Sequence, residues 1–284
     1  MSTLRTHLSL ARISNTPTVV SNALAGAALA TSLAFGWPIV ALCLASALFY
    51  TAGMYLNDIL DVEIDRQQRP DRPLPSGAVS MPMAWGITGG MFIVGLALVA
   101  TTNWHAAVAA VALIAAIAVY DAWHKGNPIG PLFMGGTRVL VYVMAFLAFS
   151  GRSAWTTEAT LWCAVMLLYV AALTSIAKME RGPAGFRYWP VVSLFLPPVL
   201  AIFRDFSPGV IVLAGVMVGW AVYSLTFVYQ QQPPAFGRAI ASLIAGISLL
   251  DALLLATHGE WIAVGIALIA FVATNVLQRW IRGT

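Results

Sequence analysis

The segment LNDILDVEIDRQQRPDRPLPSG, residues 56–77, concentrates acidic and basic side chains in a chain of which only 9% is charged. It follows directly on the apolar run WPIVALCLASALFYTAGMYL. In a helix, Asp58, Asp61 and Asp65 are three and four residues apart and share one face, with Asn57 beside them. Three carboxylates at a helix C-terminus repel one another and the helix dipole, so this arrangement favours a bound cation. Carboxylate and amide oxygens suit Mg²⁺, which completes its shell with water and substrate phosphates.

The loop after this segment supplies basic side chains close to the acids. Pro70, Pro73 and Pro75 exclude a helix there, so we expect the loop to hold Arg69 and Arg72 near the carboxylates. Arginine can bind phosphate oxygens through two parallel hydrogen bonds. The segment therefore predicts a site for a magnesium-bound phosphate group. The alternative, a helix end that is simply solvated, would explain one aspartate better than it explains a shared face of four oxygen-bearing side chains.

The rest of the chain is strongly apolar, with 60% hydrophobic residues and a mean hydropathy of +0.84. Soluble chains carry roughly a quarter charged residues, and about 20 apolar residues cross a bilayer as a helix. We therefore predict an all-α, polytopic transmembrane helix bundle of nine or ten spans in a single membrane domain, residues 1–284. The candidate spans are 15–34, 38–60, 82–101, 105–121, 131–149, 156–179, 189–204, 208–229, 238–257 and 259–280.

The basic residues predict the orientation of these spans. With the N-terminus in the cytoplasm, most of the 15 Lys and Arg residues fall at inner loops or ends, as membrane proteins prefer. An odd number of spans would place Arg279 and Arg282 outside, so ten spans fit better than nine. The net charge of +4 then reflects orientation in a membrane, which we expect to be a bacterial inner membrane, and no nucleic-acid partner is expected. MSTLRTHLSLARISNT is too polar for the apolar region of a signal peptide, so we expect the first span to be retained.

Further polar candidates lie at the end of the fourth span and inside the fifth. The sequence VYDAWHKGNPIG places Tyr120, Asp121 and Lys125 at the cytoplasmic level of the acidic segment. Lys125 is explained equally well as a cytoplasmic anchor of its helix. Arg138 lies inside an apolar span, where a charge costs about 3 kcal/mol on insertion scales, so we expect it to face a polar cavity or a partner. Asp121 is a candidate for that partner.

Two more polar residues interrupt apolar spans. Asn22 stands among small residues in SNALAGAALA, where its simplest role is a hydrogen bond between closely packed helices. Asp251 stands in SLLDALLLA, toward the outer side, and the sequence assigns it no role.

The segment NDILDVEIDRQQRPDRPLPSG resembles the first aspartate-rich signature of the UbiA superfamily of intramembrane prenyltransferases, Asn-Asp-x-x-Asp-x-x-x-Asp followed by Arg-Pro-Leu-Pro-Ser-Gly. RISNTPTVVSNALAGAALA is similar to the first helix of that family, and VYDAWHKGNPIGPLFMGGTRVL to the exit of its fourth helix. The resemblance implies a helix bundle around a central cavity that opens toward the cytoplasm. It also implies Mg²⁺, an allylic isoprenoid diphosphate, a small-molecule acceptor and surrounding membrane lipid.

The resemblance also implies roles for individual residues. Lys125 matches the family's phosphate-binding lysine and Tyr120 its companion, while Asn22 matches an asparagine turned toward the cavity. With Asp121 and Arg138, these residues form the predicted substrate site. Family members carry a second aspartate-rich motif after the sixth span, where this chain has AALTSIAKMERGP.

This departure leaves one acid, Glu180, between Lys178 and Arg181. We expect Lys178 and Arg181 to contact phosphates and Glu180 to bind a metal or orient Lys178. A salt-bridged inner loop explains the same residues equally well, because exposed pairs of this kind are common and weak. The pattern resembles the EboC-like branch of the superfamily and leaves turnover itself open.

The predicted reaction is transfer of a prenyl group after loss of diphosphate. Mg²⁺ on Asn57, Asp61 and Asp65, with Asp58 in reserve, would offset charge on the departing oxygens, and an apolar cavity would keep water from the cation. One rival is a terpene cyclase or diphosphate lyase without an acceptor. Another is a noncatalytic lipid-binding or transport protein, although the chain lacks the internal repeats of many transporters.

Overall fold

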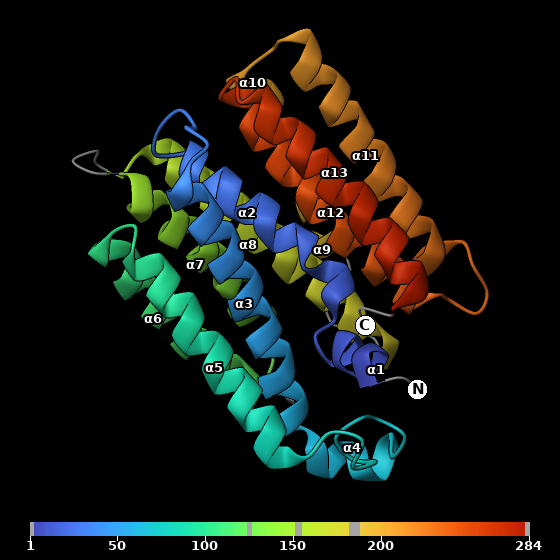
Figure 1. Ribbon diagram of the computed structural model, residues 1–284. Helices are drawn as coiled ribbons and strands as arrows, with labels where there is room; N and C mark the ends of the chain where they lie inside the picture. Colours follow the sequence, from blue (N-terminus) through green and yellow to red (C-terminus); the bar gives the residue numbers. More distant parts are fainter. Residues whose placement is uncertain (1–2, 124–126, 151–154, 182–187, 282–284) are drawn as a thin grey trace.

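The computed structural model describes residues 3–123, 127–150, 155–181 and 188–281 of the chain, and throughout these ranges the regular structure is helical (Figure 1). The first half contains α1 (Thr3–Leu10), η1 (Ile13–Asn15), α2 (Pro17–Ala28), α3 (Trp37–Leu60), α4 (Val62–Gln68), α5 (Met81–Ala100), α6 (Trp104–Trp123) and α7 (Gly130–Phe149). The second half contains α8 (Thr157–Lys178), η2 (Met179–Arg181), α9 (Trp189–Ser193), α10 (Leu196–Arg204), α11 (Pro208–Tyr229), α12 (Phe236–Thr257) and α13 (Trp261–Trp280). The predicted fold class, an all-α transmembrane bundle, is confirmed.

The predicted number of nine or ten full spans is wrong for the part of the chain that the structure describes. Eight helices there are long and apolar enough to cross a membrane, namely α3, α5, α6, α7, α8, α11, α12 and α13. The predicted span 15–34 forms only the 12-residue α2, about 18 Å long. The predicted span 189–204 is divided into α9 and α10, because Pro197 occupies the first turn of a new helix.

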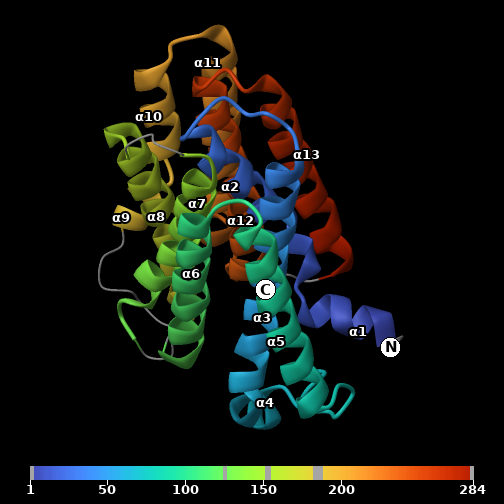
Figure 2. The ribbon, with the colours of Figure 1, turned by 60° about the vertical axis from the view of Figure 1, so that its left-hand side comes forward.

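The helices alternate in direction, which brings several C-termini to one end of the bundle. The ends of α3, α6 and α8 lie at the end that also holds α1 and α4 (Figures 1 and 2). At this end, Lys178 Nζ at the C-terminus of α8 donates a hydrogen bond of 2.7 Å to the Asn127 carbonyl. This bond joins α8 to the segment that precedes α7. We call this the acid end, because Asp58, Asp65 and Asp121 lie there.

The short helix α2 occupies the interior of the bundle and organises the helices around it. It packs against α3, α7, α12 and α13, and ten of its 12 residues are buried. A Cβ at Gly26 would lie only 2.7 Å from the backbone of Tyr142 on α7. Glycine therefore permits an approach of α2 to α7 that larger residues would prevent, as small residues do between membrane helices.

The proline-rich connection after α4 is non-helical, as predicted. Residues 69–80 form successive turns and bends, and backbone hydrogen bonds such as Val79 N–H to the Pro73 carbonyl, 3.1 Å, close the loop on itself. Leu74 and Val79 are buried, which fixes the loop against the bundle. The loop thereby holds Arg72 beside the carboxylates of α3 and α4.

Candidate functional site

The acidic segment breaks into two helices at Asp61, so its acids do not lie along one continuous helix. Asp58 is the third-last residue of α3, and Asp65 is the fourth residue of α4. Both are buried, with 8% and 6% of their surfaces exposed, whereas Asp61 between the helices is half-buried. The turn at Asp61 directs Asp58 and Asp65 toward the same side chain, Arg72, whose Nη1 lies 3.5 Å and 2.6 Å from their oxygens.

A second arginine at this site was not predicted from the sequence. Arg12 Nη2 lies 3.6 Å from Asp58 Oδ1 and 3.5 Å from Asn57 Oδ1. The backbone of Arg12 adopts the left-handed conformation, φ 42° and ψ 46°, which is costly for a residue with a side chain. Conformations of this kind concentrate at functional sites. The sequence offered no signal beyond the charge of Arg12, because the contact joins residues 45 and 46 positions apart.

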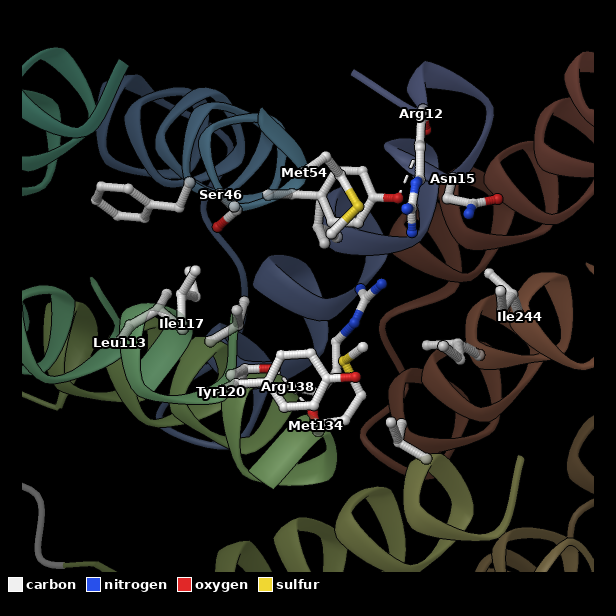
Figure 3. Close-up of a pocket in the computed structure, with 18 of the residues that line it drawn as sticks. Arg12, Asn15, Ser46, Met54, Leu113, Ile117, Tyr120, Met134, Arg138 and Ile244 are labelled. Atoms are coloured by element: carbon white, nitrogen blue, oxygen red, sulfur yellow. Dashed lines mark hydrogen bonds between the residues drawn. The ribbon is translucent and has the colours of Figure 1, made fainter. Parts of the chain in front are cut away.

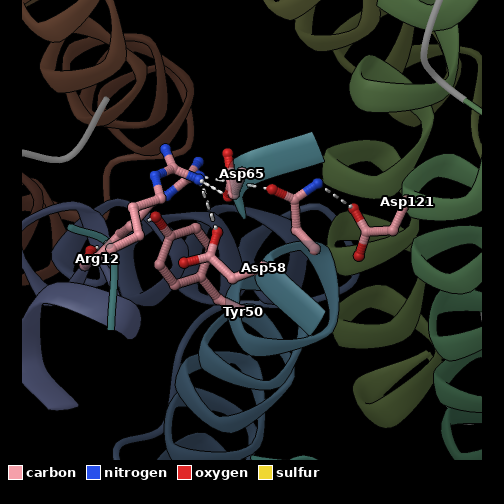
Figure 4. A network of polar contacts seen from close by, with 7 residues as sticks. Arg12, Tyr50, Asp58, Asp65 and Asp121 are labelled. Atoms are coloured by element: carbon pink, nitrogen blue, oxygen red, sulfur yellow. Dashed lines mark hydrogen bonds and ion pairs between the residues drawn. The ribbon is translucent and has the colours of Figure 1, made fainter. Parts of the chain in front are cut away.

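Asn57 on α3 connects Asp58 and its neighbours to Asp121 on α6, and both of these acids are labelled in Figure 4. Its side-chain nitrogen donates to Asp121 Oδ1 at 3.3 Å, while its side-chain oxygen faces Arg12. Asn57 and Asp121 are buried, with 9% and 4% exposed. The oxygen-bearing side chains predicted at the ends of the second and fourth spans thus meet at one place.

The acid end opens into a cavity with an empty volume of about 910 Å³, part of which is open to the outside (Figure 3). One wall is formed by α3 and α6, with Phe49, Leu113 and Ile117. Asp121, Ile117 and Leu113 are spaced four residues apart on α6, so this wall becomes apolar within about 6 Å of Asp121. The cavity thus has Asp121 and Arg12 at one end and apolar side chains deeper along this wall.

The opposite wall carries polar side chains from η1 and α7. Arg12, Asn15 and Arg138 extend toward the same space in Figure 3, and Tyr120 lies on the side of Arg138. The Arg138 guanidinium lies 5.7 Å from the centre of the Tyr50 ring, a cation–π distance. Arg138, which we expected to face a polar cavity or a partner, thus lines the cavity beside Tyr50.

Arg138 is held by a buried network of hydrogen bonds that was not predicted from the sequence. Arg138 Nη1 donates to Asn22 Oδ1 at 2.8 Å, and Asn22 Nδ2 donates to Asp251 Oδ2 at 2.7 Å. Asp251 also accepts from Ser21 Oγ and Tyr142 Oη, each at 2.5 Å. We expected Asp121 as the partner of Arg138, but Arg138 bonds to Asn22 and Asp121 accepts from Asn57. The missed signal was Asp251 itself, an acid inside an apolar span.

The remaining predicted site residues lie around the acid end. Arg69 and Glu180 are exposed, Arg72 is half-buried, and Lys178 donates to the Asn127 carbonyl. Lys125 and the side chain of Arg181 lie outside the described residues. The predicted roles of Lys125, Lys178, Glu180 and Arg181 therefore stay predictions.

The acid end offers the oxygen ligands that a magnesium ion prefers, but its carboxylates are paired with Arg12 and Arg72. Among the described residues, no three His, Cys, Asp or Glu side chains are grouped closely enough to hold a metal as they stand. Asn57, Asp58, Asp65 and Asp121 nevertheless supply only hard oxygen ligands, which fit Mg²⁺. Arg72 lies between the carboxylates of Asp58 and Asp65 and balances their charge. A metal ion bound there would replace part of that positive charge.

The fold and the site are those of a multi-span membrane protein whose cavity has Arg12 and Asp121 at one end and an apolar interior. Comparison of its sequence with known families identifies the family to which it belongs. The sequence model of the UbiA prenyltransferase family matches residues 19–239, so this chain belongs to that family. The family predicted from the aspartate-rich segment is confirmed.

Similar proteins share both sequence and fold with the chain. It is 29% identical over 184 residues to digeranylgeranylglyceryl phosphate synthase from Saccharolobus solfataricus, covering 63% of this chain and 62% of that protein. It is 30% identical over 152 residues to 4-hydroxybenzoate octaprenyltransferase from Acidovorax ebreus, covering 51% of each. The aligned region thus spans about half to three-fifths of these relatives.

The solved structure of a UbiA homolog from Archaeoglobus fulgidus bound to DMAPP and Mg²⁺ superposes with a TM-score of 0.63 at 15% identity. It covers 91% of this chain and 99% of that one. This likeness shows that the two chains share a fold.

Proposed function

We propose that this chain is a magnesium-dependent prenyltransferase that transfers an isoprenyl group from an allylic diphosphate to a small-molecule acceptor, within one membrane domain. The observation that carries the proposal is that Asp121 and Arg12 line an apolar cavity, and that Asn57 and Arg12 connect them to Asp58. Arg72 in turn joins Asp58 to Asp65. Such a cavity suits an amphiphilic ligand with a charged head group and an apolar chain. Membership of the UbiA prenyltransferase family and the Mg²⁺ and DMAPP complex of a homolog support it.

The donor would lie with its diphosphate at the acid end and its prenyl chain along the wall of α3 and α6. Met54 and Phe49 lie four and nine residues before Asp58 on α3, as Ile117 and Leu113 lie four and eight residues before Asp121 on α6. These two stripes face the same cavity, so a chain leaving the acid end is covered by apolar atoms on both sides. Burial of such a chain is favourable at roughly 0.8 kcal/mol per methylene group.

Each polar residue would have a part in ionising the donor. Asn57, Asp58, Asp61 and Asp65, with Asp121 beside them, would hold Mg²⁺, which would offset the charge that develops on the diphosphate oxygens as the allylic C–O bond breaks. Arg12 and Arg72 lie close enough to these acids to bind the same oxygens, and fixed positive charge there favours departure of the diphosphate. The apolar walls exclude water, which would otherwise capture the allylic cation. The acceptor then forms the new bond to the allylic carbon and loses a proton.

The acid end would face the cytoplasm, because most of the chain's basic residues belong to segments at this end. Lys125 follows α6 in the sequence, Lys178 is the last residue of α8, and Arg181 comes three residues later. We propose that they add positive charge around the diphosphate, in place of the second aspartate-rich motif.

The proposal is tested with purified protein in lipid nanodiscs and a panel of allylic diphosphates that includes DMAPP and geranylgeranyl diphosphate. We expect release of diphosphate that requires Mg²⁺ and stops with EDTA. Product analysis separates transfer from cyclisation, because only transfer consumes an acceptor. If no donor releases diphosphate with Mg²⁺ and candidate acceptors supplied, the proposal fails and a noncatalytic lipid-binding role is favoured.

A further inference from the structure

The polar wall of the cavity contains a charge that lies away from the predicted diphosphate site. Arg138 is the ninth residue of α7, so it lies about 12 Å along that helix from its start at the acid end. Asp58 and Asp121 are each within three residues of the ends of their helices. A diphosphate held at the acids therefore leaves Arg138 one to two helical turns deeper in the cavity.

The orientation of the Arg138 side chain is determined by residues behind it. The amide of Asn22 has only one arrangement that satisfies both neighbours, because its nitrogen must donate to Asp251 and its oxygen must accept from Arg138. Asn22, Ser21, Tyr142 and Asp251 are all fully buried. They form a rigid support, contributed by α2, α7 and α12.

This support leaves most of the guanidinium available to a ligand. Asn22 takes one of its five N–H donors, and Arg138 makes no ion pair within the described ranges. Asp251 balances the positive charge through Asn22 without covering the face that points into the cavity. A guanidinium presented in this way inside an apolar cavity matches a carboxylate or a phosphate monoester, which it can bind with two hydrogen bonds.

We propose that Arg138 is the binding site for an anionic group of the acceptor, and that Asp251 is its positioning residue through Asn22. The inference rests on the proposed function and names the substrate class. The acceptor carries a carboxylate or phosphate roughly 5–11 Å, one to two helical turns, from its nucleophilic atom. The prenyl chain lies on the opposite, apolar wall, where Leu113 and Ile117 stand apart from Arg138 in Figure 3.

Binding, measured by quenching of tryptophan fluorescence, tests the inference without turnover. The anionic probes are 4-hydroxybenzoate and decyl phosphate, and their uncharged counterparts are 4-hydroxybenzamide and decanol. We expect Arg138→Gln to lower the affinity for at least one of the anionic probes by roughly 10- to 100-fold, the loss expected for a charge-assisted contact. We expect the affinity for the uncharged counterparts to stay the same. Arg138→Lys, which keeps the charge, should restore part of the affinity.

Three comparisons make the result specific. Arg204→Gln removes an arginine that pairs with Glu158 on α8, away from the cavity lining, and should leave probe binding unchanged. Asp251→Asn should lower the ratio of anionic to uncharged affinity, whereas a merely structural role would lower only the unfolding temperature. Binding of Mg²⁺ with a non-hydrolysable thiolo-diphosphate donor should be unaffected by Arg138→Gln.

Equal binding of the anionic probes by the wild-type and Arg138→Gln proteins would overturn the inference. So would an equal loss of donor-analogue affinity, because Arg138 would then belong to the diphosphate site. Since none of these measurements needs a reaction, a protein that binds anionic probes through Arg138 but releases no diphosphate would refute the proposed function alone.

Discussion

Arg72 Nη1 lies 2.6 Å from Asp65 Oδ2 and 3.5 Å from Asp58 Oδ1, so a single arginine neutralises carboxylates from two consecutive helices. The side chains of Asp65 and Asp58 are only 9% and 11% exposed, and that of Arg72 is 25% exposed. The ion pairs join the proline-rich loop to α3 and α4. They also occupy the oxygens that a metal ion would use, so pairing with Arg72 and binding of Mg²⁺ are linked.

Replacing Arg72 by Gln should destabilise the protein most when Mg²⁺ is absent. Asp65 would then lose its arginine and Asp58 would keep only the longer contact with Arg12, at a cost of about 1–3 kcal/mol, less than for a fully buried pair because Arg72 is partly exposed. Thermal unfolding with EDTA and with Mg²⁺ measures this, and Mg²⁺ should raise the unfolding temperature more in the variant than in the wild type.

Arg66→Gln is the matched control, because Arg66 pairs with Glu63 on the exposed side of α4, where the side chains are 54% and 75% exposed. It should change the unfolding temperature little under either condition. Identical responses of the Arg72 and Arg66 variants to Mg²⁺ would contradict the linkage.

Asp65→Asn should reduce Mg²⁺-dependent diphosphate release by roughly 100-fold or more. A neutral amide binds Mg²⁺ less strongly than a carboxylate does, so the metal would stabilise the charge on the leaving diphosphate less well. The variant should remain folded, because Asn can still accept a hydrogen bond from Arg72. Release assays over a range of Mg²⁺ concentrations provide the measurement.

Glu63→Gln, two residues away on the same helix but pointing into solvent, should retain wild-type release. Activity of Asp65→Asn near that of Glu63→Gln would show that Asp65 does not serve the donor.

Leu113→Trp should shorten the donor that the cavity accepts. Leu113 lies two turns deeper than Asp121 on the apolar wall, and an indole there would occupy space needed by a long prenyl chain. Turnover of geranylgeranyl diphosphate should fall by roughly 10-fold or more relative to DMAPP, as expected for a loss of about 1.4 kcal/mol in transition-state binding.

Val111→Trp changes the outer side of the same helix, where Val111 is 53% exposed, and should leave the ratio of the two donors unchanged. If both tryptophan variants kept the wild-type ratio, the prenyl chain would not follow the wall of α3 and α6.

Gly26→Ala should destabilise the bundle although alanine favours helices. Its Cβ would lie 2.7 Å from the Tyr142 backbone, so α2 and α7 would have to separate, at a cost of about 1–3 kcal/mol. Gly136→Ala on α7 meets no atom within 4 Å, so it should be neutral or stabilising by up to about 1 kcal/mol. The unfolding temperature should therefore fall in Gly26→Ala but not in Gly136→Ala, and a fall of equal size in both would contradict the close approach.

The sequence by itself determined the features that depend on neighbouring residues. Apolar runs of membrane-spanning length predicted the long helices, because hydrophobicity and helix formation are local properties. The aspartate-rich segment predicted the family and the acidic character of one end. Pro70, Pro73 and Pro75 predicted a non-helical loop that holds Arg72 near the acids.

Only the tertiary structure decided which distant residues meet and how far each apolar run extends as a helix. Asn22 and Asp251 are 229 positions apart, and no local pattern relates them. Arg12 joins the acids because the chain turns at a left-handed residue, and α2 ends at Ala28, before the end of the predicted span. Contacts of this kind arise from packing of the whole bundle, which satisfies buried polar groups through partners that are close in space and remote along the chain.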